Sequence, residues 1–173
     1  MSDQTPVIFI SYADKDIDQV KWLKEKIEKT YGEDATVFAS KYVNGGCGWR
    51  DKIEEAARSA SVAILLCSPN ALKSFWVMFE AGMFKGCGIP FVPLLFNRAK
   101  VNMIPSCILD VQAKFADDTD EVAEAFKTVE DSIRTKKEIS AVEIRDYFVN
   151  VKNLTGSQIL ISNEGIDNIL RKG

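Results

Sequence analysis

Histidine is absent from this chain of 173 residues. Its absence excludes Ser-His-Asp and Cys-His triads, histidine-ligated zinc and a histidine general base. Any catalysis must then come from carboxylates, hydroxyls, thiols, lysine or backbone dipoles. The four cysteines contain no C-x-x-C pair, so we expect reduced thiols and no metal site.

The chain also lacks a long apolar run, a signal peptide and a block of like charge. No stretch reaches the roughly 18 apolar residues that span a bilayer. The first residues, MSDQT, have neither the basic nor the apolar region of a secretory signal. The net charge of −3 comes with no clustered basic face for nucleic acid. We therefore expect a cytoplasmic protein with no membrane partner and no nucleic-acid partner.

Apolar runs alternate with helical periodicities over the first 134 residues. Strands are expected at 7–10, 35–39, 61–67, 90–96 and 112–116, and helices at 17–31, 49–60, 71–86 and 117–134. Continuous apolar strands between helices indicate an α/β protein with a parallel sheet covered on both faces. Pro93 indicates a bend or an edge position for its strand.

The character of the sequence changes after residue 134. Residues 1–134 are expected to form the main domain, and residues 135–173 a C-terminal extension or linker of unknown role. Apolar spacing in the extension fits a helix near 141–151, a strand at 158–162 and a second helix at 166–171. The extension either packs on the edge of the domain or begins a further module.

Several polar residues follow predicted strands. Right-handed crossovers place the ligand crevice at the carboxyl ends of parallel strands. Tyr12, Ser40, Ser68 and the glycine-rich loop 43–48 all fall at such ends. We expect the functional site there.

Glu80 is the only charged residue between positions 74 and 84. Trp76 precedes it by four residues, so the two side chains share a helix face. A carboxylate among aromatic side chains is costly to ionise, which makes Glu80 a candidate for chemistry or ligand contact. The alternative is a structural carboxylate paired with Lys73, Lys85 or a backbone N–H, with Trp76 as a core residue.

Nucleotide-binding motifs of two common kinds are missing. There is no G-x-G-x-x-G after the first strand and no G-x-x-x-x-G-K-S/T. Asp14 and Asp16 fit the acidic pocket of a phospho-receiver domain, but the third strand ends in Cys67-Ser68-Pro69 without the required aspartate. These two acids are better explained as helix caps.

Three segments together resemble the TIR (Toll/interleukin-1 receptor) domain family over residues 5–134. They are Phe9-Ile10-Ser11-Tyr12 at the end of the first strand, the loop 41–49 in the place of the BB loop, and Trp76-x-x-x-Glu80 after Ser68-Pro69-Asn70. The resemblance implies a flavodoxin-like three-layer sandwich with a central, mostly parallel five-stranded sheet. The glycine loop lacks the proline of receptor-type adaptors, which favours the enzymatic members.

For members with this glutamate the resemblance implies cleavage of NAD⁺ to nicotinamide and ADP-ribose or a cyclic ADP-ribose isomer, in bacterial anti-phage immunity or signalling. NAD⁺ would be the substrate, with no cofactor and no metal. Glu80 would be catalytic, and the substrate-binding residues would be Ser11, Tyr12, Ser40, Lys41, Trp49 and Trp76. Partners would be a second copy, through loop 43–48, and a downstream effector or a fused sensor domain.

The reaction suits a protein without histidine. Loss of nicotinamide builds oxocarbenium character on the ribose, and nicotinamide departs as a neutral pyridine that needs no general acid. A carboxylate in an apolar pocket can stabilise the developing charge. Two other functions stay open: a non-catalytic TIR–TIR adaptor module, and a nucleoside deoxyribosyltransferase with a glutamate nucleophile.

Overall fold

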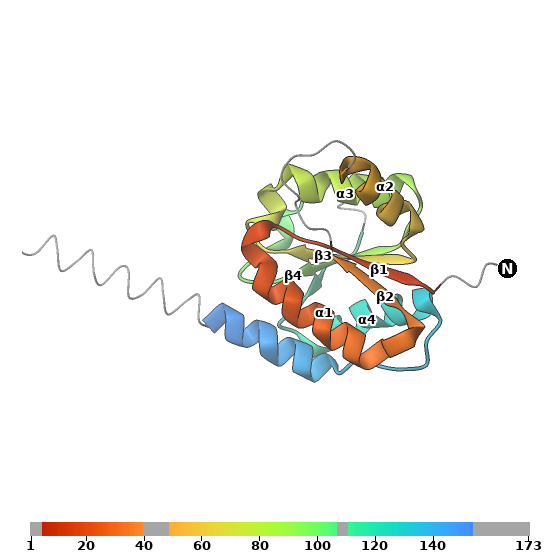
Figure 1. Ribbon diagram of the computed structural model, residues 1–173. Coiled ribbons are helices and arrows are strands. Elements are labelled where there is room, and N and C mark those ends of the chain that lie inside the picture. Colours follow the sequence, from red (N-terminus) through yellow and green to blue (C-terminus); the bar gives the residue numbers. More distant parts are fainter. Residues whose placement is uncertain (1–4, 40–48, 107–110, 154–173) are drawn as a thin grey trace, which may run out of the picture.

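Five parallel strands form the centre of the molecule. The computed structural model describes residues 5–39, 49–106 and 111–153, including their side chains except at 49–52. The strands are β1 Val7–Ser11, β2 Thr36–Ala39, β3 Val62–Cys67, β4 Phe91–Leu95 and β5 Lys114–Phe115, in the order β2-β1-β3-β4-β5 (Figure 1). This order is that of a flavodoxin-like sheet, so the predicted α/β fold class is confirmed.

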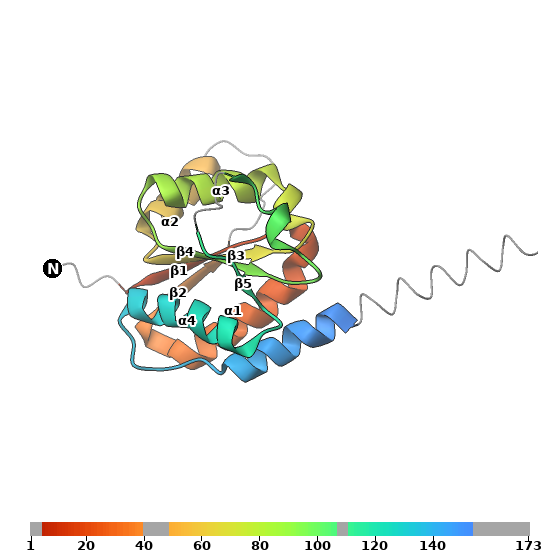
Figure 2. The same ribbon diagram turned by 180° about the vertical axis from the view of Figure 1, so that it is seen from behind.

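Helices cover both faces of the sheet. Helices α1 (Ile17–Tyr31) and α4 (Thr119–Ile133) lie on one face, and α2 (Trp49–Ser59) and α3 (Phe75–Gly86) on the other (Figures 1 and 2). Two apolar cores result, because successive strand residues point to opposite faces. In β3, for example, Ile64 and Leu66 enter the α1/α4 core, whereas Leu65 enters the α2/α3 core.

The helix expected over 71–86 is divided into two parts. A 3₁₀ turn, η3 (Ala71–Lys73), precedes α3, and Ser74 between them has an extended backbone (φ −80°, ψ 116°). The Ser74 hydroxyl accepts a hydrogen bond from the Val77 N–H at 3.4 Å, which caps α3. The prediction missed this cap because the apolar periodicity continues across it.

Pro93 lies in an inner strand, so the predicted edge position is wrong. Just before β4 the Pro90 carbonyl accepts a hydrogen bond from Ala63 of β3, and just after it the Phe96 N–H donates to Cys67 of β3. Odd-numbered residues of β4 therefore face β5, because backbone groups alternate sides along a strand. The pairing with β5 begins only at Leu94, so no hydrogen bond to β5 is lost through the missing N–H of Pro93.

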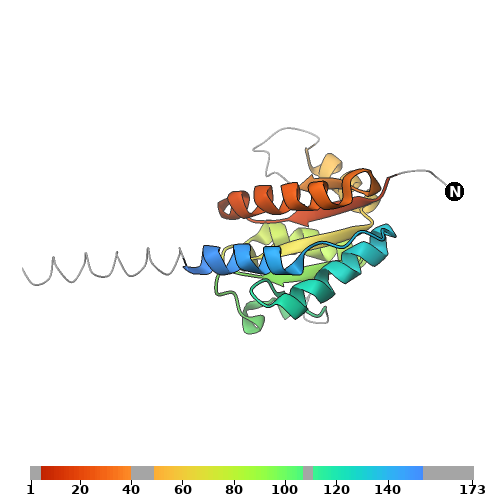
Figure 3. The ribbon, with the colours of Figure 1, turned by 90° about the horizontal axis from the view of Figure 1, so that it is seen from below.

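The chain packs onto the domain beyond residue 134. Residues 141–153 are helical and lie along α1 and α4, on the outer side of that layer (Figure 3). Ile144 and Phe148 are fully buried in the α1/α4 core, and the Tyr147 ring stacks on Trp22 of α1 at 3.9 Å between centroids. Residues 135–153 thus continue the same core, while the expectations for 158–162 and 166–171 lie outside the described residues.

A buried glutamate fixes the connection between α4 and this last helix. Glu130 Oε1 accepts hydrogen bonds from the Tyr31 hydroxyl at 3.1 Å and from the Ile139 N–H at 2.9 Å. Burial, together with the charge of Glu130, raises the pKa of Tyr31 well above its ordinary value, so the phenol stays a donor.

None of the helices in the described part of the chain combines the length and the apolar character of a membrane-spanning segment.

Candidate functional site

Glu80 is held inside the fold by a helix that packs directly on β1. Phe84 of α3 meets Phe9 of β1 edge to face, with ring centroids 5.0 Å apart. Glu80 lies one turn before Phe84, and Ser11 lies two residues after Phe9, so both pairs share the contacting faces. The Ser11 hydroxyl donates a hydrogen bond to Glu80 Oε2. Periodicity in the helix and in the strand thus brings Glu80 to the carboxyl end of β1.

Neither Glu80 nor Ser11 has exposed surface. The burial of Glu80 at the carboxyl end of β1 agrees with an isolated acid in an apolar helix, whereas its predicted contact with a ligand stays a prediction. The sequence predicts that Ser11 contacts the substrate, and in the structure its hydroxyl donates a hydrogen bond to Glu80. In the described conformation Ser11 positions the carboxylate, and a ligand reaches Glu80 only when neighbouring atoms move.

A second buried carboxylate lies at the same edge of the sheet. Asp16 is almost fully buried, and its Oδ2 accepts a hydrogen bond of 2.6 Å from the Ser68 hydroxyl, just after β3. Ser68 Oγ also accepts from the Ala71 N–H at 3.1 Å. Burial raises the pKa of Asp16, partly offset by the bond from Ser68. Asp16 occupies the N-cap position of α1, as predicted, but its side chain makes no capping bond and is hydrogen-bonded by Ser68 instead.

The two serine–carboxylate bonds cross between neighbouring βα units. Ser11 at the end of β1 holds Glu80 of the helix that follows β3, whereas Ser68 after β3 holds Asp16 of the segment that follows β1. The strand order reverses between β1 and β3, so both bonds lie at the topological switch point. In open α/β sheets the ligand crevice lies outside the strands' carboxyl ends at such a point.

Tyr12 and Cys67 complete the surroundings of the two carboxylates. Burial raises the pKa of Tyr12, and the charges of Asp14 and Glu80 raise it further. The phenol therefore stays protonated at neutral pH. Burial raises the pKa of Cys67 to about 12, helped by the charge of Asp16. This thiol is not a nucleophile at neutral pH.

The other predicted site residues are placed only in part. Trp76 is half-buried on α3, with its ring 5.5 Å from the exposed Phe79 ring. The backbone of Trp49 begins α2. Ser40, Lys41, the loop 43–48 and the side chain of Trp49 lie outside the described residues, so their predicted roles stay predictions.

A separate pocket of about 380 Å³ lies at the carboxyl ends of β4 and β5. Its walls include Phe96, Asn97, Phe115 and Lys152. None of Glu80, Ser11 or Trp76 lines it. Among the described residues, no cluster of three cysteine or carboxylate side chains is arranged to hold a metal ion.

The sheet order and the buried carboxylate at its switch point define a flavodoxin-like domain with a candidate site at its carboxyl edge. The family model of the TIR domain matches residues 8–129, and the chain belongs to this family. The matched range covers the five strands, apart from Val7 at the start of β1, and most of α4. No curated protein matches the chain. The family includes signalling domains and NAD-consuming enzymes, and it gives no support to the deoxyribosyltransferase alternative.

Proposed function

We propose that this TIR domain cleaves the bond between nicotinamide and ribose in NAD⁺, with Glu80 as the catalytic carboxylate. The observation that supports the proposal is the burial of Glu80 at the switch point, with its Oε2 hydrogen-bonded by Ser11. A carboxylate kept from bulk water stabilises positive charge far better than an exposed one. Cleavage then needs no histidine and no metal.

The chemistry assigns a distinct task to each of three residues. Glu80 lies against the ribose as oxocarbenium character develops and stabilises that charge. Ser11 fixes the orientation of the carboxylate, and Tyr12 donates a hydrogen bond at neutral pH. Water attack on the ribose gives ADP-ribose, and attack by a group of the same nucleotide gives a cyclic isomer, which exclusion of water favours. We place this activity in the cytoplasm, in bacterial anti-phage defence or signalling.

The closed state of Glu80 predicts that activity depends on self-association. Since Glu80 has no exposed surface in the single chain, the pocket must open before NAD⁺ reaches it. Contact with a second copy, which we place at loop 43–48, would supply that change. Nicotinamide release per mole of protein should therefore rise steeply with protein concentration.

The decisive experiment compares two isosteric changes at buried glutamates. Glu80→Gln keeps an acceptor for Ser11 but removes the charge, so nicotinamide release should fall at least about 100-fold. Glu130→Gln is the matched control, because Glu130 is also buried and hydrogen-bonded but lies on α4. Products are separated by liquid chromatography and identified by mass spectrometry. Equal activity of Glu80→Gln and the native chain, at similar melting temperatures, would refute the assignment.

The second candidate is a non-catalytic TIR–TIR module. The same complete burial of Glu80 favours it, because a carboxylate without exposed surface can serve structure alone. Stable NAD⁺ at high protein concentration, together with concentration-dependent oligomers in sedimentation velocity, would establish this function instead.

A further inference from the structure

Exposed apolar side chains are concentrated at one end of the sheet. In the described part of the chain, the exposed large hydrophobic residues are Phe75 (94%), Phe79 (42%), Val101 (48%), Met103 (37%) and Val142 (49%). Phe75 and Phe79 lie one turn apart on α3, and Val101 and Met103 form η4 (Val101–Met103), after β4. Because β3 and β4 are adjacent and parallel, the segments that follow them start from the same edge. Figure 2 shows the start of α3 and the green turn of η4 at that end.

The same segments carry positive charge. Between positions 69 and 106 the only acid is the buried Glu80, whereas Lys73, Lys85, Arg98 and Lys100 are basic and exposed, in a chain whose net charge is −3. Among the ion pairs of the described residues, none involves Lys73, Arg98 or Lys100. We call the surface of Lys73, Phe75, Phe79, Arg98, Lys100, Val101 and Met103 the β3–β4 rim.

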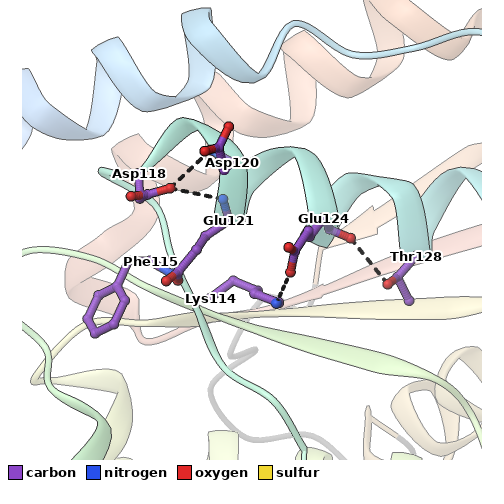
Figure 4. A network of polar contacts seen from close by, with 7 residues as sticks. All are labelled: Lys114, Phe115, Asp118, Asp120, Glu121, Glu124 and Thr128. Atoms are coloured by element: carbon purple, nitrogen blue, oxygen red, sulfur yellow. Dashed lines mark hydrogen bonds and ion pairs between the residues drawn. The ribbon is translucent and has the colours of Figure 1, made fainter.

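A second copy of the chain could in principle cover the rim with its most acidic segment, at the start of α4, but this segment is poorly suited to that role. Carboxylates at the start of α4 are already engaged within the chain, as Figure 4 shows for most of them. Asp118 accepts from the Asp120 and Glu121 N–H groups at 3.0 Å, Glu121 accepts from the Phe115 N–H at 2.6 Å, Glu124 pairs with Lys114, and Asp117 pairs with Lys152 at 2.6 Å. Recruiting these four carboxylates would break internal bonds, which makes them costly counter-charges for the rim of a second copy.

We propose that the β3–β4 rim binds the surface of a bilayer that contains anionic phospholipids. A side chain as fully exposed as Phe75 has no pocket around it, and a fluid interface accepts such a protruding ring without a matching partner shape. Lys73, Arg98 and Lys100, which form no ion pair within the described part of the chain, are attracted by anionic head groups. This contact is peripheral and departs from our expectation of no membrane partner, which was based on the absence of a spanning segment, of a signal peptide and of a clustered basic face in the sequence. It is independent of NAD⁺ cleavage.

The test measures co-sedimentation of the full chain with vesicles of phosphatidylcholine alone or with about one third phosphatidylserine. We expect binding to the anionic vesicles only, and its weakening at high salt. Lys73→Glu with Lys100→Glu should reduce the partition coefficient roughly 25-fold or more, because each surface base contributes about fivefold. Phe75→Ser should reduce it about tenfold through loss of the inserted ring.

Matched controls make the same changes away from the rim. Lys136→Glu with Val142→Ser alters an exposed base and a half-exposed apolar side chain in the C-terminal segment, and should bind like the native chain. Thermal melting confirms that each variant folds. Three results with vesicles would overturn the proposal: no binding to anionic vesicles, equal binding to both kinds of vesicle, or binding of the rim variants at the native level. A fourth would be evidence that the rim of the native chain forms oligomers or binds single-stranded RNA instead.

Discussion

Replacing Phe148 by alanine should show whether the C-terminal helical segment is part of the domain's cooperative core. The Phe148 ring is about 1% exposed, and its centroid lies 5.1 Å from that of Phe96 and 6.4 Å from that of Trp22. It therefore connects residues 141–153 to the end of β4 and to α1. Truncation of this ring to alanine leaves a cavity between the C-terminal helix, α1 and the end of β4.

The expected loss is about 3 to 5 kcal/mol of unfolding free energy, the usual range for a buried phenylalanine changed to alanine. In a chain of 173 residues, each kcal/mol lowers the melting temperature by about 2 to 4 °C. Phe148→Ala should then melt roughly 6 to 20 °C below the native chain. The matched control is Val142→Ala, in the same helix but half-exposed, which should change stability by no more than about 0.5 kcal/mol.

Urea unfolding followed by far-ultraviolet circular dichroism provides the measurement. We expect a single transition for the native chain and for both variants, with the midpoint shifted only in Phe148→Ala. A separate early transition, or a loss below about 1 kcal/mol in Phe148→Ala, would show that residues 135–153 are an appendage. The domain would then end near residue 134, as the sequence suggests.

Two further predictions concern the buried serine–carboxylate bonds. Ser11→Ala removes the donor to Glu80, so we expect a loss of about 1 to 3 kcal/mol in urea unfolding and a parallel fall in nicotinamide release; unchanged stability would contradict the bond. Burial raises the pKa of Asp16, so above about pH 4 the folded state holds a proton that the unfolded state has lost. The contribution of Asp16 to the free energy of unfolding therefore falls as the pH rises above that value. Relative to the native chain, Asp16→Asn should therefore become more stable as the pH rises above about 4, and parallel pH profiles of the two proteins would refute this.

Local patterns in the sequence were sufficient to predict the elements of the main domain. The run Val62–Cys67 is apolar throughout because both faces of β3 are buried, and α1 ends at Tyr31 because Gly32 adopts a positive φ of 58°. The prediction failed at Pro93 because the shortness of β5, not the position of β4, permits the proline. Whether residues 135–153 pack on the domain or begin a further module could not be decided from the sequence, since the packing depends on which helix faces remain open after the sheet forms.

The burial of Glu80 could be predicted in part, whereas its partner could not. An isolated acid in an apolar helix indicates burial, but Ser11 is 69 positions away in the sequence. The signal that was overlooked is the alternation of the strands. Phe9 and Ser11 share the face of β1 that meets α3, and Ser68 continues the face of β3 that meets α1. Extending each strand's alternation by one or two residues would have indicated which helix each serine contacts.

This crossed arrangement determines which parts of the domain can move to open the site. Glu80 is tied to the end of β1, and Asp16 to the segment after β3, so α3 and the start of α1 are each bonded to the neighbouring unit. Moving α3 away from the sheet would break the Ser11 bond and separate Phe84 from Phe9, at a cost of several kcal/mol. A movement that opens the site and leaves α3 on the sheet would keep both contacts. Activation of the domain should therefore leave α3 in place, and amide hydrogen exchange along α3 should stay slow in the NAD⁺-cleaving state.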